Sequence, residues 1–239
     1  MAGIMENLRK IIIVGVNSTI GKSILDLYYE KDYVCFGTYN KNTLNGELID
    51  KCQNIIQCDL SNINGIKKLL EFCKKEQPYH IIYLPGSIDN KSLEDNDLQT
   101  IHKTFNTNLF AYWLLISECI PYMKVVKYGR FLSLSSIGSK FGGGEKRFNY
   151  TSSKKLLEFF PKDFKKVAEY NIFINNIVCG VTDTNILKKK NNESILQRTK
   201  LIPVGRLAKP TEIALCCYQI CSEKNTFQTL SNITIAGGE

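Results

Sequence analysis

Tyr150 and Lys154 lie four residues apart, and Ser136 precedes them on a different segment of the chain. Side chains with this spacing share one face of a helix, so the lysine ammonium can sit beside the tyrosine phenol. A free tyrosine titrates near pH ~10, and a neighbouring cation favours the phenolate and lowers that pKa. A nearby serine hydroxyl can hydrogen-bond a carbonyl oxygen aimed at the phenol. These residue types therefore predict acid–base chemistry on a carbonyl group.

A glycine-bearing segment, Gly15 to Ser23, links a short apolar run to a helical pattern. In such a turn, backbone N–H groups and the helix N-terminus can bind phosphate. The ending Gly-Lys-Ser is that of a P-loop, but five residues separate the two glycines where a P-loop has four, and no acid-rich strand end follows to bind a metal. The favoured interpretation is a dinucleotide-binding turn of the form G-x-x-x-G-x-G, in which Thr19 replaces the middle glycine.

Apolar runs and helical patterns alternate along the entire chain, without a repeat or a linker-like tract. Seven runs are expected to be strands: 11–14, 34–38, 55–58, 81–84, 130–134, 173–178 and 233–236. Helical periodicity is expected over 21–30, 63–75, 98–123, 151–170 and 211–221. The alternation predicts one α/β domain over residues 1–239, a doubly wound Rossmann-type parallel sheet of about seven strands with helices on both faces.

Several residues with functional potential follow directly after expected strands. They are Gly15, Asp59, Gly86, Ser136 and Gly180. Because ligands of doubly wound sheets bind beyond the carboxyl ends of the strands, we expect these residues to line one edge of the sheet and to form one site.

Composition argues against several other classes of protein. The net charge of +8 comes from lysines spread over many segments without interleaved aromatic residues, which favours a solvated basic surface over a nucleic-acid interface. No apolar run approaches the roughly 20 residues that span a bilayer, and no signal peptide is expected. Nine unpatterned cysteines predict reduced thiols in a cytoplasmic protein. With only His80 and His102 available, no metal site is expected.

The chain resembles the short-chain dehydrogenase/reductase family, in the subgroup similar to 3-oxoacyl-[acyl-carrier-protein] reductases. The resemblance covers nearly the whole length. Its motifs occur in order as the glycine turn, Asp59, Thr107-Asn108-Leu109, the run from Gly129 to Ser136, the Tyr150/Lys154 pair, the loop from Gly180 to Thr184, and Pro203-Val204-Gly205-Arg206-Leu207.

The sequence also departs from the family's pattern at several positions. Thr19 replaces a glycine, and Tyr83-Leu84-Pro85-Gly86 stands where the family has Asn-Asn-Ala-Gly. Cys179 stands where proline usually precedes Gly180. None of these departures removes an expected catalytic side chain, but they put the loop after the fourth strand and the grip on the pyrophosphate in question.

The resemblance implies that Asn108, Ser136, Tyr150 and Lys154 are the catalytic residues. Tyr150 would give its proton to a substrate carbonyl while the nicotinamide delivers hydride to the carbon. Lys154 would lower the pKa of Tyr150 and hold the nicotinamide ribose. Ser136 would orient the carbonyl, with Ser135 as the alternative hydroxyl, and Asn108 would fix a water that refills the proton.

The resemblance also implies a set of cofactor contacts. These are Gly15, Asn17, Ser18, Thr19, Ile20, Gly21, Thr38, Asn40, Lys41, Asp59, Leu60, Gly86, Tyr150, Lys154, Gly180, Val181, Thr182 and Thr184. Asp59 matches the acidic residue that holds the adenine ring. The segment Thr38-Tyr39-Asn40-Lys41 lacks the carboxylate that binds both ribose hydroxyls of NAD, and its side chains can accommodate a 2′-phosphate. NADP is therefore favoured over NAD.

The substrate is less sharply defined by the sequence. Segment 185–202 lies where the family keeps a substrate lid, and its Lys188-Lys189-Lys190, Arg198 and Lys200 suit a phosphate, an activated sugar or the acidic carrier of an acyl chain. A lid that faces water carries lysines in any case. The leading expectation is an NADP-dependent reductase that converts a ketone, in a 3-oxoacyl thioester, to a secondary alcohol.

Two alternatives remain open at this point. One is a reductase of a keto-sugar or another polar intermediate of carbohydrate biosynthesis, and the other is a non-catalytic dinucleotide-binding sensor or scaffold on the same fold. Family analogy further implies a homotetramer or homodimer, with the expected helices 98–123 and 151–170 at an interface.

Overall fold

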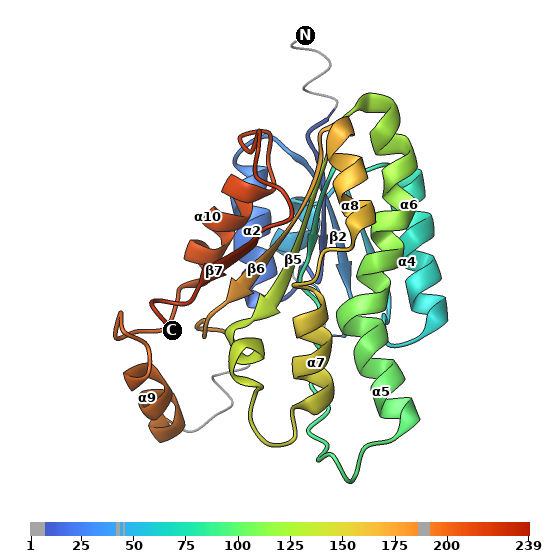
Figure 1. The fold of residues 1–239 in the computed structure, drawn as a ribbon. Helices are drawn as coiled ribbons and strands as arrows, with labels where there is room; N and C mark the ends of the chain where they lie inside the picture. The colour runs from blue at the N-terminus through green and yellow to red at the C-terminus, as the bar shows by residue number, and fades with distance from the viewer. Residues whose placement is uncertain (1–7, 42–43, 45, 186–191) are drawn as a thin grey trace.

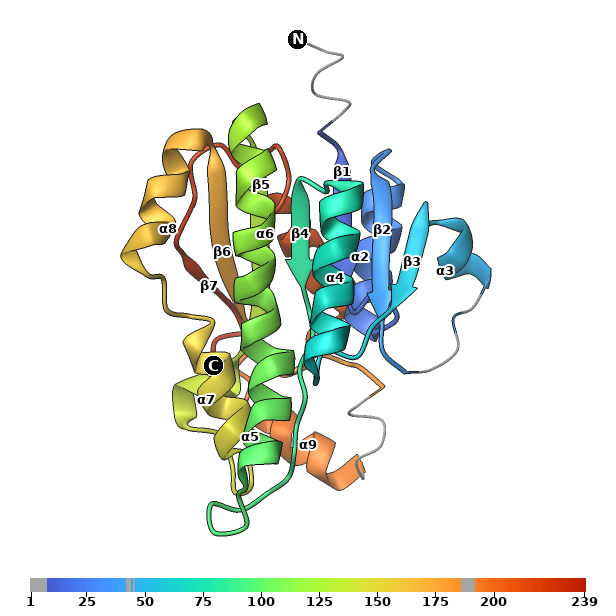
Figure 2. The ribbon, with the colours of Figure 1, turned by 90° about the vertical axis from the view of Figure 1, so that its right-hand side faces the viewer.

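In the computed structural model, residues 8–41, 44, 46–185 and 192–239 are described, and they form a seven-stranded sheet in which every pairing is parallel. The strand order is β3-β2-β1-β4-β5-β6-β7. The strands are β1 (Lys10–Val14), β2 (Val34–Tyr39), β3 (Asn54–Gln57), β4 (His80–Tyr83), β5 (Gly129–Ser136), β6 (Ile172–Cys179) and β7 (Asn232–Ile235). Helices cover both faces (Figure 1 and Figure 2), so the predicted doubly wound fold is confirmed.

Two hydrophobic cores lie on opposite faces of this sheet. The first face is covered by α2 (Thr19–Tyr29) and α10 (Pro210–Ile220), and the second by α4 (Ile63–Glu76), α6 (Ala111–Val126) and α8 (Lys162–Val167). Successive side chains of a strand point to opposite faces. Accordingly, Ile11 and Ile13 of β1 belong to the first core, and Ile12 and Val14 to the second. Because both faces are covered, the central strands appear in the sequence as continuous apolar runs.

One expected helix, over 151–170, is wrong as drawn from the sequence. The chain forms α7 (Phe148–Leu156), leaves the helical conformation at Phe159 and Phe160, and resumes in α8 after Pro161. Proline has no backbone N–H and disfavours helix in the residue before it, so Pro161 can begin a helix but cannot continue one. The interruption makes α7 an independent element that can sit at the edge of the sheet.

The expected helix 98–123 is present, with an internal change of geometry. It consists of α5 (Leu98–Phe105), a π-helical turn (Asn106–Phe110) and α6. Two further helices, α3 (Gly46–Asp50) and α9 (Asn192–Lys200), were not expected. Such π-turns occur often at functional sites, and this one contains Asn108.

The combined helix Leu98–Val126 is long and apolar enough to cross a membrane by length and composition. In this structure it packs on the sheet instead, and Leu109, Leu115, Cys119 and Met123 are completely buried. Figure 2 shows it running along the face of the sheet beside α4. Its apolar character is therefore explained by the core that it covers.

Arg130 is the largest side chain that is almost fully buried, and it lies at the amino end of β5. Its guanidinium donates hydrogen bonds to the carbonyl oxygens of Gly129, Asn171 and Asn225, at 2.7–2.8 Å, and to the Asn171 side chain. The rings of Tyr128 and Phe173 flank it, with centroids 4.4 and 4.1 Å away. This residue therefore joins three loops at the end of the sheet opposite to Ser136.

We expect Arg130→Met to lower the free energy of unfolding by about 3 kcal/mol, because it leaves several buried carbonyl groups without a donor. Urea denaturation followed by circular dichroism measures the effect. Arg9→Met is the control, since the Arg9–Glu223 ion pair is largely at the surface and its loss should cost under about 1 kcal/mol. Equal midpoints for the two variants would contradict the structural role given to Arg130.

Candidate active site

Ser136 and Tyr150 are brought together where β5 ends and α7 begins. Ser136 is the last residue of β5, and its hydroxyl oxygen accepts a hydrogen bond from the Gly138 N–H at 3.2 Å, which starts a 3₁₀ turn (Ile137–Phe141). Tyr150 is the third residue of α7, and its phenol lies near enough to the Ser136 side chain for that hydroxyl to act on the phenol's pKa. The two hydroxyl groups thus face one point beyond the carboxyl end of β5.

Lys154 lies one turn farther along α7 and is only 3% exposed. Its ammonium donates hydrogen bonds to the backbone oxygens of Pro85 and Leu134, each at 2.8 Å. Burial lowers the pKa of Lys154 to about 8. The lysine is therefore fixed between the end of β5 and the loop that follows β4.

Gly86 lies against both members of the tyrosine–lysine pair. A Cβ atom at this position would lie 3.5 Å from the Lys154 Nζ and 3.7 Å from the Tyr150 ring. The two side chains therefore flank the same backbone position, as the four-residue spacing predicted.

Burial dominates the pKa of Tyr150 in this structure, and the effect expected from Lys154 stays a prediction. Burial raises the pKa of Tyr150 above its usual value, and the Ser136 hydroxyl and the Arg147 cation offset this only in part. The Lys154 ammonium is directed at two carbonyl oxygens. In this structure the phenol is thus held in its protonated form, which is the form that a proton donor needs.

The Asn108 side chain forms its hydrogen bonds with Ser87 and Ser153 and not with Ser136 or Tyr150. Its side-chain oxygen accepts from the Ser87 N–H at 2.6 Å, and its amide donates to the Ser87 carbonyl and, at 2.8 Å, to the Ser153 hydroxyl. Ser153 in turn donates to the Tyr150 carbonyl oxygen at 2.9 Å. Asn108 therefore clamps the loop after β4 to α7, and the water that it was expected to hold stays a prediction.

Ser87 and Ser153 were not among the residues singled out from the sequence. Ser153 lies between Tyr150 and Lys154, and that position alone is the signal that would have pointed to it. Ser87 gave no signal, because it contributes only backbone groups to the Asn108 side chain.

The choice between the two neighbouring serines follows from their surroundings. The Ser135 hydroxyl is buried inside the sheet, where it accepts from the Asn176 amide at 3.1 Å and lies 3.5 Å from the Ile177 carbonyl. Side chains of adjacent strand residues point to opposite faces. Ser136 is therefore the hydroxyl that is directed to Tyr150.

The glycine turn between β1 and α2 is compact. Gly15 has a φ of 86°, which favours glycine, and a Cβ at Gly21 would lie 2.5 Å from the Gly15 carbonyl oxygen, so Gly21 has no room for a side chain. The Ser18 hydroxyl caps α2 by accepting from the Gly21 N–H at 3.0 Å. This arrangement leaves the first N–H groups of α2 at the carboxyl edge of the sheet, where a phosphate is favoured.

Polar side chains join the end of β2 to the glycine turn and to the residue after β3. Asn17 donates to the Lys41 carbonyl at 2.9 Å, and Asn40 donates to the Asp59 carboxylate at 3.2 Å. Burial acts to raise the pKa of Asp59, but hydrogen bonds from Ser61 and Asn40 and the Lys41 cation bring it below the usual value. Asp59 is thus held as a carboxylate among donors.

Two of the expected cofactor contacts have side chains turned inward. Thr38 is buried, and its hydroxyl oxygen accepts a hydrogen bond from the Gly15 N–H at 3.3 Å. Leu60 belongs to the second hydrophobic core. Only the backbone of Leu60 can therefore face a ligand, and a 2′-phosphate would have to rely on Asn40 and Lys41.

The loop after β6 closes the other side of the site. A Cβ at Gly180 would lie 2.6 Å from the Ala236 Cα, so only glycine fits there. Thr182 is buried, with its hydroxyl donating to the Gly180 carbonyl at 3.1 Å, and it pairs with Ala208. The loop then reaches back across the site, since the Asn185 N–H donates to the Thr19 hydroxyl at 3.3 Å.

The lid expected over 185–202 is described only in part. Lys188, Lys189 and Lys190 lie outside the described residues, whereas residues 192–200 form α9. Arg198 pairs with the Glu239 side chain, and the Lys140 ammonium contacts the Glu239 backbone oxygen at 3.3 Å. Arg198 is therefore already neutralised by the chain itself, which weakens its case as an anion receptor.

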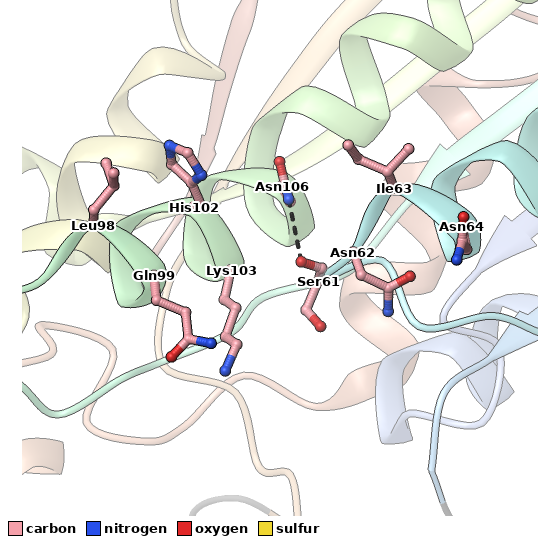
Figure 3. A pocket seen from close by; sticks show the side chains of 9 residues that line it. All are labelled: Ser61, Asn62, Ile63, Asn64, Leu98, Gln99, His102, Lys103 and Asn106. Atoms are coloured by element: carbon pink, nitrogen blue, oxygen red, sulfur yellow. Dashed lines mark hydrogen bonds between the residues drawn. The ribbon is translucent and has the colours of Figure 1, made fainter.

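An open cavity of about 680 Å³ lies between the N-terminus of α4 and the outer side of α5 (Figure 3). Its lining consists of Ser61, Asn62, Ile63, Asn64, Leu98, Gln99, His102, Lys103 and Asn106. None of these is a residue expected to contact substrate or cofactor. The Asn106 amide donates to the Ser61 carbonyl at 3.1 Å, so the cavity wall is braced by the protein itself.

Comparison with known sequences agrees with this geometry. The profile of the short chain dehydrogenase family matches residues 9–195. The uncharacterized oxidoreductase YmfI of Bacillus subtilis (strain 168) is 28% identical over 237 residues, covering 95% of this chain and 97% of its own. The 3-oxoacyl-[acyl-carrier-protein] reductase FabG of Chlamydia pneumoniae is 24% identical over 247 residues, covering 96% of each chain.

Solved structures show the same fold at lower identity. A 3-oxoacyl (acyl-carrier-protein) reductase from Agrobacterium tumefaciens C58, crystallised with NADP bound, superimposes with a TM-score of 0.85 at 17% identity and covers 98% of this chain and 97% of its own. YwfH, an NADPH dependent reductase involved in bacilysin biosynthesis, superimposes with a TM-score of 0.81 at 20% identity. The match covers 96% of this chain and 97% of the YwfH chain. With the family profile matching most of the chain, the protein belongs to the short-chain dehydrogenase family of NAD(P)-dependent oxidoreductases.

Proposed function

We propose that this protein is an NADPH-dependent reductase that converts a ketone to a secondary alcohol, with Tyr150 as the proton donor. The observation that carries the proposal is the meeting of three groups from two elements. The Ser136 hydroxyl lies near enough to the Tyr150 phenol to act on its pKa, and the Lys154 ammonium lies beside the same glycine as the phenol ring. A carbonyl oxygen placed between the two hydroxyl groups would have a donor on each side.

The backbone around these groups fits a dinucleotide. A side chain at Gly21 would fill the glycine turn, and a side chain at Gly86 would reach toward Lys154 and Tyr150. Gly21 thus permits the turn to pack closely on the start of α2, and Gly86 keeps the backbone beside Lys154 and Tyr150 free of a side chain. When bound, the nicotinamide supplies hydride to the carbonyl carbon.

Tyr150 and Ser136 stabilise the negative charge that develops on the carbonyl oxygen. The Tyr150 phenol transfers its proton to the carbonyl oxygen as negative charge develops there, and the Ser136 O–H donates a hydrogen bond to the same oxygen. Ser136 is free to do so because the Gly138 N–H occupies a lone pair and leaves the hydroxyl proton available. The raised pKa of Tyr150 keeps its proton in place at neutral pH.

Lys154 retains one donor for a ligand. An ammonium has three N–H groups, and two of them bind the carbonyl oxygens of Pro85 and Leu134. The third has no acceptor among the described residues and would bind a ribose hydroxyl of the cofactor.

The preference for NADPH is supported by the end of β2. Thr38, Tyr39, Asn40 and Lys41 carry no carboxylate, and the Lys41 cation lies close enough to act on Asp59. A 2′-phosphate placed near Asn40 and Lys41 would meet a donor and a charge rather than repulsion. Solved relatives were crystallised with NADP, in agreement with this preference.

The substrate that fits best is a 3-oxoacyl thioester. Exposed apolar side chains, Phe141, Leu196 and Val204, lie on the segments that surround the carboxyl end of β5, and a relative of known activity acts on such substrates. The pairing of Arg198 with Glu239 removes part of the positive charge that favoured a keto-sugar. A polar keto intermediate stays the second candidate because of the remaining lysines of segment 185–202.

Lys127 is a further cation that could meet an acidic carrier protein, but it does not lie near Ser136 within one chain. Lys127 lies just before Gly129, at the amino end of β5, and Ser136 lies at its carboxyl end, roughly 20 Å away. Near Lys127, the Lys124 ammonium rests on the Tyr170 ring, 4.9 Å from its centroid. These cations could serve an acidic carrier only through a neighbouring subunit of an oligomer.

Assembly into a homotetramer or homodimer is supported by exposed apolar side chains on neighbouring helices. Phe110 and Leu114 on the α5–α6 helix, and Phe148 and Leu156 on α7, are each more than a third exposed. Contact between α5 and α7 places these residues on adjacent elements. A cytoplasmic location stays a prediction.

Tyr150→Phe tests the proposal most directly. We expect kcat for NADPH-dependent reduction to fall 10²–10⁴-fold, because the variant lacks the proton donor, while NADPH binding persists. Oxidation of NADPH is measured at 340 nm against a panel with a 3-oxoacyl thioester, a keto-sugar and simple ketones. Tyr170→Phe, at the far end of the sheet, serves as the control with unchanged turnover. Tight NADPH binding by the wild-type protein with no turnover on any ketone would favour the sensor instead.

Cofactor choice is tested by fluorescence titration with NADPH and NADH. We expect NADPH to bind about tenfold tighter or more, because charge-assisted hydrogen bonds to the 2′-phosphate are lost with NADH. Lys41→Gln should weaken NADPH binding and leave NADH binding unchanged. Tighter binding of NADH by the wild-type protein would rule out the assignment.

The buried ammonium of Lys154 predicts a pH dependence of stability. Its pKa is about 8 in the folded chain and near 10.5 in the unfolded chain, so between these values the unfolded state binds more protons. Stability relative to Lys154→Met should therefore increase as pH rises from 8 to 10.5, by up to about 3 kcal/mol, and should change little outside this window. Urea unfolding of both proteins across this pH range measures the difference. A constant difference would contradict the lowered pKa.

A further inference from the structure

Thr19 stands where dinucleotide turns of this form have a glycine, and its hydroxyl is used in an unexpected way. The oxygen accepts a hydrogen bond from the Asn185 N–H at 3.3 Å. Thr19 is the first residue of α2, and Asn185 follows the loop after β6, so the contact joins segments 166 residues apart. It therefore crosses from one side of the predicted pyrophosphate site to the other.

The Asn185 contact determines what the hydroxyl can still do. A threonine hydroxyl has one proton and two lone pairs. Since the Asn185 N–H occupies a lone pair, the proton of Thr19 must point elsewhere, and it has no acceptor among the described residues. As a β-branched residue, Thr19 also has few side-chain rotamers in a helix, so the hydroxyl is held near this orientation.

The other hydroxyl groups of the turn are already used within the protein. Ser18 caps α2 by accepting from the Gly21 N–H at 3.0 Å, and Ser23 donates to the Thr19 carbonyl at 3.4 Å. In contrast, the backbone N–H groups of Thr19 and Ile20 have no protein acceptor in the described structure. The unused O–H of Thr19 thus stands beside two unused N–H groups at the positive end of a helix dipole.

We propose that the Thr19 hydroxyl is a cofactor-positioning group that donates its proton to a pyrophosphate oxygen of the bound dinucleotide and is oriented for this by the Asn185 N–H. The inference rests on the proposed function, since it presumes a dinucleotide at this site. The side chain replaces the close backbone approach that glycine permits with a directed donor. It also connects the pyrophosphate to the loop that leads from β6 toward α9.

Variants at Thr19 separate the effect of its hydroxyl donor on cofactor binding from the effect of its side-chain volume. Thr19→Val keeps the shape and lacks the hydroxyl, so we expect the Kd for NADPH to rise about tenfold or more. Thr19→Ser keeps the donor and should bind within a few-fold of the wild type. Ser23→Ala, which removes a hydroxyl from the same turn, is the matched control with unchanged affinity. Thermal unfolding of each variant confirms that it is folded.

A ligand without a pyrophosphate tests whether the effect of Thr19 on binding depends on the pyrophosphate. Adenosine 2′-monophosphate retains the adenine and the 2′-phosphate but has no pyrophosphate, so its affinity should be equal in the wild type and in Thr19→Val. Asn185→Pro removes the orienting N–H, and we expect it to weaken NADPH binding in the wild type but to add little in the Thr19→Val background, because the two groups act together.

The outcomes distinguish the inference from the proposed function. If the wild-type protein binds neither NADPH nor NADH, the proposed function is wrong and the role of Thr19 falls with it. If it binds NADPH, and Thr19→Val binds as tightly as the wild type, the function stands and the inference is wrong. Tighter binding by both Thr19→Gly and Thr19→Val would show that Thr19 only obstructs the cofactor, which also overturns the inference.

Discussion

The geometry of the site depends on how one buried charge is satisfied. Lys154 is 3% exposed and has no carboxylate partner in the described part of the chain, so its ammonium is stabilised by the backbone oxygens of Pro85 and Leu134. Burial of a charge is costly unless hydrogen bonds replace its water. These two bonds therefore fix α7 against the ends of β4 and β5, and because Tyr150 is one turn away on the same helix, they also fix the phenol beside Ser136. The lowered pKa of Lys154 is the remaining cost of that arrangement.

The loop after β4 shows how the chain tolerates its departure from the family pattern. The family's paired asparagine amides are absent from Tyr83-Leu84-Pro85-Gly86. In their place, the Tyr83 hydroxyl donates to the Thr107 carbonyl at 2.6 Å, and the Asn108 side chain binds both backbone groups of Ser87. The loop is thus anchored from the π-helical turn rather than from its own amides. This anchoring supports a working reductase and argues against a degenerate one.

The fold and the proximity of Tyr150 to Lys154 could be predicted because they depend on local patterns. Buried parallel strands need apolar runs, and the tyrosine–lysine spacing is a property of any helix. Pro161 indicated a break in the expected helix 151–170, but the apolar periodicity on both sides of it favoured one continuous helix. The raised pKa of Tyr150 and the inward direction of the Thr38 hydroxyl could not be predicted from the sequence. Both depend on burial and on partners from distant segments of the chain. The same holds for the contact between Thr19 and Asn185.

The two ends of the sheet differ in how their polar donors are used, although the Arg130 Nε at the amino end is also buried without a partner among the described residues. At the amino end, the Arg130 guanidinium places four N–H groups on oxygens of the protein. At the carboxyl end, one N–H of Lys154, the Thr19 hydroxyl and the first N–H groups of α2 have no acceptor among the described residues. Donors without partners are unfavourable unless water or a ligand completes them. Their concentration along one edge, each held in place by its other hydrogen bonds, is what a preorganised anionic binding site requires.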